Sequence, residues 1–421
     1  RSTGRTELAA GMASLSDSPA PRTHERPLLL GSVLWGPRFV DTFCRTALAS
    51  LLAPDNIPAC VGGGEREARF LIATDPADRP RIEARPEITA LREFMAVDYL
   101  DLAKGGSSMV RMSAGHRLIT ARFAEAGALA GIVYPDSLYA DGTLAWAKRA
   151  IDAGARLATV ACPRACVDDL LDALELERSG AALSVEAATL GRRALRHPHD
   201  ELLRCFWPRS TFGDRPAVCA WPVPAAADPP SALLLYSLCW APLLLDFSAL
   251  AGHDAGSLEG WTIDGDYLYR NVGEGRDGTV AVPAAGDPAL IVSLSNPDQG
   301  ITGLRRHPLL ALPVAGHFFR RAMMRHWLND PAIDPLKRVL FRRPVVWGEA
   351  PADVLAPVRQ DAERALASVE APPGAFDRVV YALVRVRPRL AARLWFLLSW
   401  PISKLPGRFR HGLRRTLRRP R

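Results

Sequence analysis

Two pairs of aspartates have side chains and spacing suited to chemistry. Asp136 and Asp141 lie in IVYPDSLYADGT, residues 132–143, directly after an apolar stretch. Asp264 and Asp266 flank a glycine in TIDGDYL. Carboxylate oxygens are preferred ligands of Mg²⁺ and Mn²⁺, and a carboxylate can also act as a general base. The sequence therefore predicts metal binding or proton transfer at these two places.

Each pair also has a plainer interpretation. Asp141 is followed by Gly142 and Thr143, a pattern typical of a turn that leads into a helix. Asp264 and Gly265 form a dipeptide typical of a two-residue hairpin loop. For these residues the sequence leaves both interpretations open. For Asp136 the site is favoured, because this residue directly follows a predicted buried strand.

Two basic side chains stand near the same predicted strand ends. His116 lies in a predicted helix, 108–125, that directly precedes the strand of Asp136, so it is a candidate nucleotide contact. The default interpretation of such a histidine is a place in the core or on the helix surface. Arg164 follows a later strand and is suited to pairing with a phosphate, or else is an ordinary surface charge.

Three other patterns do not support a site. His197 and His199 form a His-x-His pair without a second cluster at zinc-binding spacing, which favours local capping. Cys162 and Cys166 lack the two-residue spacing of a metal motif and are interpreted as core thiols. The glycine-rich CVGGGERE at 60–67 fits neither a dinucleotide fingerprint nor a P-loop.

Strands and helices alternate along the first half of the chain. Apolar runs predict strands at 27–35, 68–74, 94–102, 128–135 and 155–161, and helical spacing predicts helices at 38–52, 75–83, 108–125, 143–153 and 166–177. This alternation predicts an α/β domain with a doubly wound, mainly parallel sheet. Ligands of such sheets bind beyond the carboxyl ends of the strands, which is where Asp136 falls.

The chain is long enough for more than one domain. Residues 1–26 are small, polar and predicted to be disordered. Residues 27–215 form the predicted α/β domain, and the proline-rich stretch 208–230 marks a boundary. Residues 216–350 are expected to form a smaller α+β extension, with strands on both sides of its Gly/Asp turns, including the turn within 260–273. Residues 351–421 are predicted to be a helix and a basic helical tail.

The basic charge of the protein is concentrated in this tail. The formal net charge is +8, but residues 378–421 carry twelve Arg and one Lys without any Asp or Glu, so the rest of the chain is net acidic. Aromatic and aliphatic side chains between 376 and 400 complete an amphipathic pattern. It favours an anionic membrane surface over contact with a partner or with the protein's own core, and nucleic acid is the least favoured ligand. The apolar run 231–245 is too short to span a bilayer, and seven scattered cysteines favour the cytosolic side.

Several stretches together support a family resemblance. The first domain resembles the nucleotide-sugar-binding half of GT-A glycosyltransferases, through VDTFCRTALASLL, RFLIATDPAD and GIVYPDSLYADGT. NIPA, MSAGHR and TIDGDYL are in addition similar to a group of uncharacterised bacterial proteins of presumed glycosyltransferase type. The resemblance covers about residues 28 to 345.

This resemblance implies a nucleoside-diphosphate sugar donor and a Mn²⁺ or Mg²⁺ cofactor. Asp136 matches the first acid of the family's Asp-x-Asp motif, whereas position 138 is Leu, so the second acid must be Asp141 or one of the pair Asp264/Asp266. The implied roles are nucleotide binding for Asp136, Arg164 and His116, metal binding for Asp136 and Asp141, and catalysis for Asp264 and Asp266.

The leading hypothesis is a glycosyltransferase at the cytosolic, inner face of the membrane. It would move a sugar from a nucleotide donor to a lipid-linked or polymer acceptor, and residues 376–421 would bind the anionic surface. A non-catalytic binding or scaffold protein of the same fold is the alternative, favoured by Leu at position 138. A methyltransferase is less favoured because no glycine-rich loop follows the first strand.

Overall fold

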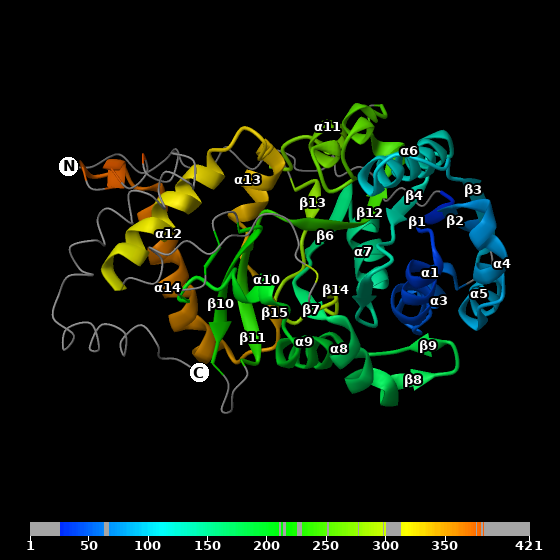
Figure 1. The fold of residues 1–421 in the computed structure, drawn as a ribbon, viewed down its shortest axis with the longest axis horizontal. Coiled ribbons are helices and arrows are strands. Elements are labelled where there is room, and N and C mark those ends of the chain that lie inside the picture. Colours follow the sequence, from blue (N-terminus) through cyan, green and yellow to red (C-terminus); the bar gives the residue numbers. More distant parts are fainter. Residues whose placement is uncertain are drawn as a thin grey trace, which may run out of the picture.

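A computed structural model describes residues 26–62, 67–209, 212–213, 216–224, 230–250, 252–276, 278–297, 299, 313–375, 377–379 and 382. Among these residues, a seven-stranded sheet with the order β13-β6-β12-β4-β1-β2-β3 forms the centre (Figure 1). Its strands are β1 (Leu28–Val33), β2 (Ala68–Thr74), β3 (Ala96–Asp101), β4 (Leu129–Ile132), β6 (Leu157–Ala161), β12 (Trp240–Asp246) and β13 (Val280–Ala281).

The sheet is largely parallel, as predicted. Strands β1 to β4 run parallel, β12 runs antiparallel to both β4 and β6, and β13 is parallel to β6. All six residues of β1 are buried, which is typical of parallel strands covered on both faces. The α/β fold class with a mainly parallel central sheet is therefore confirmed.

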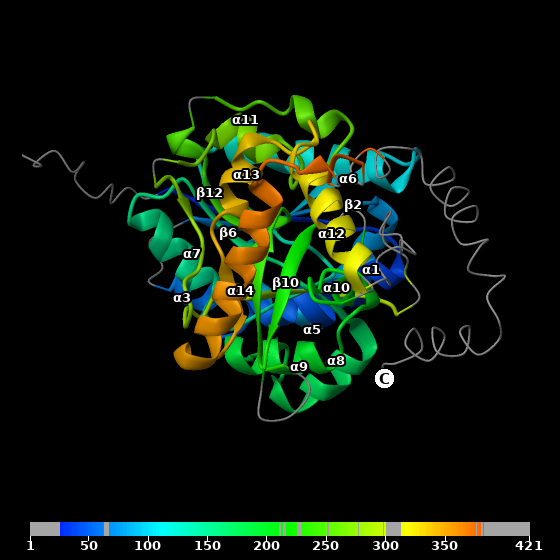
Figure 2. The same ribbon diagram turned by 90° about the vertical axis from the view of Figure 1, so that its left-hand side faces the viewer.

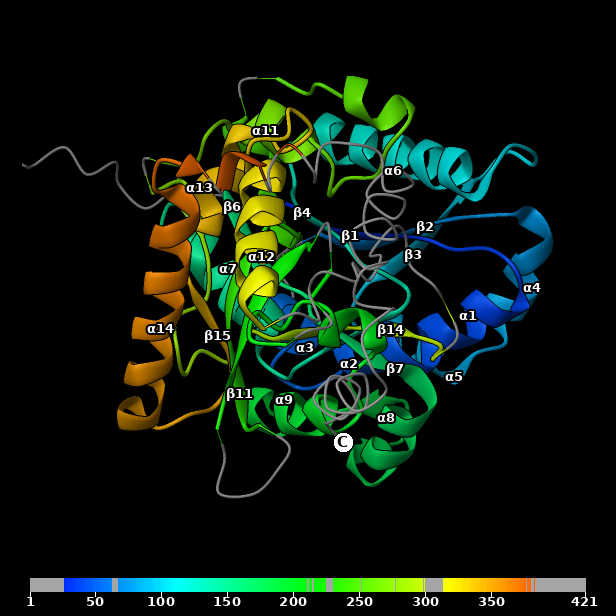
Figure 3. The ribbon, with the colours of Figure 1, turned by 60° about the vertical axis from the view of Figure 1, so that its left-hand side comes forward.

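Helices cover both faces of this sheet. Leu29 of β1 packs in one core with Ile119 and Phe123, whereas Leu28 packs in a second core with Val40 and Phe43. Alternate side chains of the strand thus point into opposite layers. Figure 3 shows α6 on one side of the strands and α1 to α3 on the other.

The helices of these layers and of the rest of the described chain have the following bounds. They are α1 (Pro37–Phe43), α2 (Ala49–Leu51), α3 (Ile57–Val61), α4 (Arg79–Glu83), α5 (Pro86–Leu91), α6 (Ser108–Glu125), α7 (Thr143–Asp152), α8 (Val167–Leu174), α9 (Ala187–Arg196), α10 (Asp200–Leu203), α11 (Tyr267–Val272), α12 (Pro313–Leu328), α13 (Pro335–Phe341) and α14 (Ala352–Glu370). A π-helical turn, Cys44–Leu48, joins α1 to α2, and short 3₁₀ turns occupy Pro76–Asp78, Glu175–Glu177, Phe247–Ala249 and Gly256–Glu259.

A smaller sheet lies at the end of the central one and has the order β5-β14-β7. Its strands are β5 (Ser137–Tyr139), β7 (Arg164–Cys166) and β14 (Ile291–Ser295). Ser293 of β14 is opposite both Ser137 and Arg164. This register brings the segment that follows β4 and the segment that follows β6 to the two sides of one strand.

A third sheet, β10-β11-β15, carries the C-terminal helices. It consists of β10 (Val218–Val223), β11 (Ala232–Ser237) and β15 (Val345–Gly348), and a two-stranded hairpin pairs β8 (Arg178–Ser179) with β9 (Ala182–Leu183). Figure 2 shows α12 and α14 in front of β10. Phe319 and Met323 of α12 and Leu355 of α14 share a core with Trp221 and Leu234 of this sheet.

The region expected to begin at residue 216 shares sheets with the α/β domain before it. Strand β12 is inserted between β4 and β6, and β14 lies between β5 and β7. Both halves of the chain therefore contribute strands to the region where the parallel strands of the central sheet end.

Most predicted elements of the first half are confirmed, whereas one prediction in the second half is wrong. The expected strands around Asp264 and Asp266 are instead a turn followed by helix α11. Tyr267, Leu268 and Val272 are buried there, and the helix lets them face the core together. The predicted disordered segment, except Arg26, and most of the basic tail lie outside the described residues.

Among the described residues, no helix combines the length and the apolar character that crossing a bilayer requires.

Candidate functional site

A cavity of about 410 Å³ opens where the strand order reverses. The chain leaves β1 toward β2 and β3 on one side and returns to β4 on the other, so β1 and β4 enclose the switch point at which such sheets bind ligands. Val33 ends β1 and lines the cavity, as does the segment Val133–Ser137 that follows β4. Four of the predicted site residues line it too: His116, Asp136, Arg164 and Asp264.

Asp136 is half-buried directly beyond β4. Its backbone carbonyl accepts a hydrogen bond of 2.7 Å from the Leu294 N–H of β14, which fixes the chain as it enters the small sheet. Burial raises the pKa of the Asp136 carboxyl above its ordinary value, and the nearby positive charge of Arg164 partly opposes this effect. The buried surroundings of Asp136 thus disfavour the ionised form of its carboxyl group. Shifted pKa values of this kind are frequent at functional sites.

Arg164 begins β7 and its side chain is fixed by two neighbours. Its Nη1 donates a hydrogen bond of 2.6 Å to Ser295 Oγ, and its Nε lies 3.2 Å from Glu201 Oε2. The guanidinium therefore combines an ion pair with a position on the cavity wall. It is more than an ordinary surface charge, because it lines the cavity and lies across β14 from Ser137, the residue after Asp136.

His116 is buried, with 2% of its surface exposed. Its Nδ1 accepts a hydrogen bond of 3.1 Å from the Ile263 N–H. Burial lowers the pKa of His116 to about 4, and Asp264 only partly opposes this effect. The imidazole is therefore neutral at pH 7, and since Nδ1 accepts, Nε2 carries the proton. Such a group can donate a hydrogen bond to a ligand in the cavity.

Close packing of α6 brings His116 to the cavity. A Cβ atom on Gly115 would lie 2.4 Å from Cγ1 of Val33, a distance too short for any side chain without displacement. The helix can therefore approach β1 closely at this point. Ser113 Oγ of the same helix donates a hydrogen bond of 2.9 Å to the Trp261 carbonyl, which ties α6 to the segment of Asp264.

We expect His116 to make stability depend on pH. Its pKa is lowered in the folded protein, so its contribution is complete above pH 6.5 and is lost as the pH falls from 6.5 toward 4. At pH 4, this pKa shift should lower the free energy of unfolding by about 3 kcal/mol. A His116→Asn variant keeps an acceptor for the Ile263 N–H but does not titrate. Urea unfolding from pH 4 to 7.5 should therefore show a steeper acid loss for wild type, whereas parallel curves would contradict this assignment.

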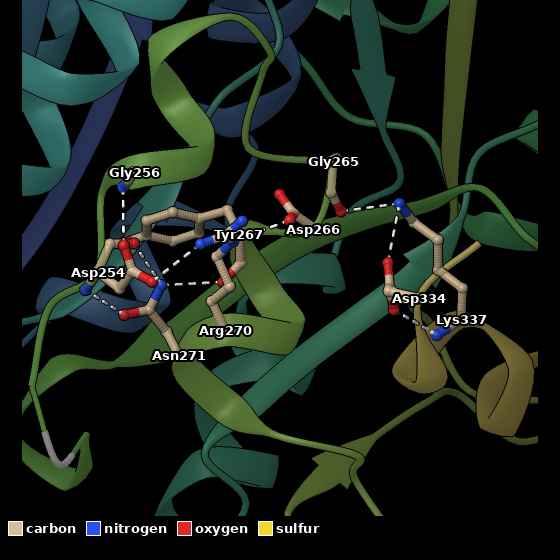
Figure 4. A network of polar contacts seen from close by, with 9 residues as sticks. All are labelled: Asp254, Gly256, Gly265, Asp266, Tyr267, Arg270, Asn271, Asp334 and Lys337. Atoms are coloured by element: carbon tan, nitrogen blue, oxygen red, sulfur yellow. Dashed lines mark hydrogen bonds and ion pairs between the residues drawn. The ribbon is translucent and has the colours of Figure 1, made fainter. Parts of the chain in front are cut away.

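Asp264 lies in the turn before α11, and the turn is anchored from several directions. Thr262 Oγ1 donates a hydrogen bond to the Asp264 carboxylate. Lys337 Nζ of α13 donates a hydrogen bond of 2.7 Å to the Gly265 carbonyl and also lies 3.2 Å from Asp334 Oδ2 (Figure 4). A lysine far away in the sequence thus anchors the turn directly after Asp264.

Asp266 does not join the cavity. Its carboxylate accepts a hydrogen bond of 2.8 Å from Arg270 Nε, one helical turn later, and its side chain is 41% exposed (Figure 4). Arg270 also lies 3.3 Å from Asp254. The predicted catalytic pair is therefore separated, with Asp264 on the cavity wall and Asp266 in an ion-pair network at the surface.

Asp141 is likewise placed away from Asp136. Its Oδ1 accepts a hydrogen bond of 2.8 Å from the Asp55 N–H, and its Oδ2 accepts one of 2.6 Å from Ser184 Oγ. Strand β5 separates the two acids and carries Asp141 to a different cavity. The structure therefore does not support the expected partnership of Asp141 with Asp136. The turn interpretation holds, since Gly142 adopts the left-handed conformation before α7.

His199 caps a helix, as the sequence favoured. Its Nδ1 accepts a hydrogen bond of 3.2 Å from the Glu201 N–H at the start of α10, and its Nε2 lies 3.1 Å from the Asn296 carbonyl. Both ring nitrogens are thus used within the fold. Burial lowers the pKa of His199, which keeps the ring neutral.

Sequence reasoning missed several side chains of the cavity wall. Tyr134 lines it, and the tyrosine hydroxyl is buried without a hydrogen-bond partner among the described residues. Cys162 and Cys239 line it from the ends of β6 and β11–β12, and burial raises the pKa of both thiols, to about 11 for Cys239. Tyr134 was detectable because it directly precedes Pro135-Asp136. Cys239 was not, since only the tertiary structure brings its strand there.

The donor set for a divalent cation is limited. Within the described ranges, no group of three or more His, Cys, Asp or Glu side chains could hold a metal ion. Asp136 and Asp264 both line the cavity, and Mg²⁺ is often held by one or two carboxylates together with substrate phosphates and water. The cavity therefore fits a cation that a phosphate ligand helps to bind, and not a cation held by protein ligands alone.

No protein-family model matches this chain, and no curated protein matches it significantly.

Proposed function

We propose that the protein is a GT-A-type glycosyltransferase that uses a nucleoside-diphosphate sugar as donor. The observation that carries the proposal is the convergence of Asp136, Asp264, Arg164 and a neutral His116 on one cavity at the switch point of a largely parallel sheet. Much of the rest of the wall is apolar, including Val33, Met112, Val133 and Trp240. An apolar pocket with a few convergent polar groups is typical of small-molecule sites.

The charges of the wall decide how a diphosphate can bind. Asp136 and Asp264 are acidic, Arg164 is cationic, and His116 is neutral, so the cavity does not by itself attract an anion. A Mg²⁺ or Mn²⁺ ion held by Asp136 would neutralise the diphosphate. Arg164 is suited to a phosphate oxygen, and His116 Nε2–H is suited to a neutral oxygen of the ribose or the sugar.

The transfer step needs a base for the acceptor. In an inverting reaction, the acceptor hydroxyl attacks the anomeric carbon, the bond from that carbon to the donor phosphate breaks, and the nucleoside diphosphate leaves with the electron pair. Asp264 is the candidate that receives the hydroxyl proton, because it is on the cavity wall and accepts a hydrogen bond from Thr262. A base of this kind contributes about 100-fold to 10,000-fold.

A panel of nucleotide sugars tests the donor proposal. Binding by calorimetry and donor consumption are measured with Mn²⁺ for wild type and for Asp136→Asn. We expect one donor to bind and be consumed. Asp136→Asn should weaken metal-dependent binding about tenfold or more, because one charge-assisted ligand is lost.

Asp141→Asn is the matched control, since it removes a carboxylate charge from the next acid of the same segment. It should leave donor affinity unchanged. Binding of no donor at millimolar concentration, or equal losses in the two variants, would overturn the proposal.

Asp136→Asn should also make the fold more stable at neutral pH. The pKa of Asp136 is raised in the fold, so its charged form is disfavoured there. Its stability contribution is greatest below the ordinary pKa of an aspartate and is lost as the pH rises through the raised pKa. Removing the charge should therefore raise the melting temperature at pH 7.5, with a gain that disappears in acid. An equal gain at both pH values would argue against this explanation.

The acceptor and its location complete the proposal. The acceptor is lipid-linked or polymeric, and the basic residues 376–421 hold the protein on the anionic inner face of the membrane. Their charge and aromatic content support this. Flotation with anionic and with neutral vesicles, for the full chain and for a chain ending at residue 375, tests it. Binding to anionic vesicles that survives the truncation would exclude the tail as the anchor.

A non-catalytic binding protein of the same fold is the second candidate. The absence of a group of three metal-ligating side chains within the described residues favours it, as does the ion pair that already engages Arg164. Donor binding without any consumption, across the panel and with an acceptor fraction from membranes, would support this candidate over the enzyme.

A further inference from the structure

A second hollow adjoins the cavity and shares two residues with it. This hollow, of about 290 Å³, is lined by Arg38, Phe39, Thr42, Asp136, Leu294 and Asn296, among others. Phe39 and Asp136 line the larger cavity as well. The two spaces therefore share Phe39 and Asp136 in their walls, and they are called here the larger and the smaller lobe.

The two lobes differ in chemistry. The larger lobe contains the carboxylate of Asp264, the ion-paired Arg164 and the neutral His116. The smaller lobe contains Arg38, which is exposed and has no ion pair with any described residue. Thr42 and Asn296 add a hydroxyl and an amide that can donate hydrogen bonds. An arginine side chain without an ion pair, next to neutral hydrogen-bond donors, is suited to binding an oxyanion.

The wall of the smaller lobe is held in place by the fold. The Asn296 carbonyl lies 3.1 Å from His199 Nε2 and accepts a hydrogen bond of 3.0 Å from the Gln299 N–H. Leu294 donates its N–H to the Asp136 carbonyl. Strand β14 thus fixes Asn296 relative to Asp136, so the lobe has a defined wall.

A transferase binds an acceptor as well as its donor. Asp136 lines both lobes, so it lies between the space for the donor and the space for the acceptor. Arg164, on the other side, is the cation that partly offsets the burial of Asp136. Arg38 is exposed, lines the smaller lobe and is available to a ligand there. A ligand with an anionic group at Arg38 could direct a hydroxyl toward Asp136 and the donor in the larger lobe.

We propose that the smaller lobe is the acceptor subsite, and that it takes a hydroxyl-bearing phosphate ester whose phosphate Arg38 anchors, with Thr42 and Asn296 as further donors. This inference rests on the proposed glycosyltransferase function and narrows its acceptor to a phosphate-bearing molecule. The phosphate belongs either to a soluble ester or to a lipid headgroup.

Binding of glycerol 3-phosphate to the full chain tests the subsite, with glycerol as the uncharged comparison. Calorimetry is performed on wild type, Arg38→Gln and Arg45→Gln. Arg45 is an exposed arginine about two turns later in the same helical stretch and lines neither lobe. We expect wild type and Arg45→Gln to bind the phosphate ester, Arg38→Gln to bind it about tenfold or more weakly, and glycerol not to bind.

A second binding experiment distinguishes the phosphate of a soluble ester from the phosphate of a lipid headgroup. Vesicles of phosphatidylglycerol are compared with vesicles of phosphatidylcholine for the same variants. Because residues 376–421 also attract anionic vesicles, Arg38→Gln is compared with Arg45→Gln, which has the same tail and the same net charge. Weaker vesicle binding by Arg38→Gln than by Arg45→Gln, without a difference in the soluble arm, supports a headgroup, and weaker binding in the soluble arm supports a free ester. Equal binding by Arg38→Gln and wild type in both arms, or no binding in either, overturns the inference.

The failure of this inference is distinguishable from the failure of the proposed function. Arg38→Gln should leave nucleotide-sugar affinity unchanged, because Arg38 lies outside the larger lobe. If donors bind and Arg38→Gln has no effect on either phosphate ligand, the acceptor subsite alone is wrong. If no donor binds, the glycosyltransferase is wrong, and with it the acceptor role of this lobe.

Discussion

An Asp264→Asn variant should lose about 100-fold or more in kcat/KM, while Asp266→Asn retains nearly the wild-type value. The two aspartates are two residues apart, so the variants make the same chemical change in the same turn. Asp264 lines the cavity and accepts a hydrogen bond from Thr262. Asp266 pairs with Arg270 at the surface. In the proposed reaction, only Asp264 is placed at the cavity to take the proton of an acceptor hydroxyl.

Steady-state kinetics with the donor found in the panel, together with a membrane acceptor fraction, measure this difference. The loss in Asp264→Asn should fall mainly on kcat, because a base acts in the transition state. Both variants should unfold at nearly the same urea concentration, since an exposed ion pair such as that of Asp266 contributes at most about 1 kcal/mol. Similar activity in the two variants would exclude Asp264 as the base.

A Gly131→Ala variant should be destabilised by about 3 kcal/mol or more. Gly131 lies in β4 beside β12, and an added Cβ would lie 2.0 Å from the Leu243 carbonyl oxygen. The obstacle is backbone, which cannot rotate away as a side chain can. The register of β12 against β6 is irregular between Pro242 and Leu244, so this strand is already distorted at the point of contact.

Urea unfolding monitored by tryptophan fluorescence measures the loss. Gly260→Ala is the matched control, because a Cβ there would have no neighbour within 4 Å and its φ of −144° suits any residue. It should change stability by no more than about 0.5 kcal/mol. If the two variants are equally stable, β12 is not packed against β4 as closely as the structure shows. Trp240 and Ala241 of β12 line the larger lobe, so the unstable variant should also lose donor binding.

The sequence by itself determined the first half of the fold. Continuous apolar runs such as LLLGSV and ARFLIAT predicted strands that the structure contains, and the helix predicted at 108–125 has those bounds in the structure. Asp136 was identifiable as a candidate because a strand, a proline and an acid follow one another there. Each of these patterns involves residues that are close together in the sequence, so it predicts the secondary structure of that segment.

Only the tertiary structure decided which of the candidate site residues line the same cavity. Asp141 and Asp266 resembled Asp136 and Asp264 in type and spacing, but hydrogen bonds to Ser184 and Arg270 hold them elsewhere. Strand β12 joined the central sheet from beyond the proline-rich stretch, because an apolar run does not reveal its pairing partner. Asp264 and Asp136 are far apart in the chain but share a cavity, because α6 and α13 hold the turn of Asp264 through Ser113 and Lys337, and β14 holds Asp136 through Leu294. Such proximity depends on long-range packing, which residue type and spacing do not encode.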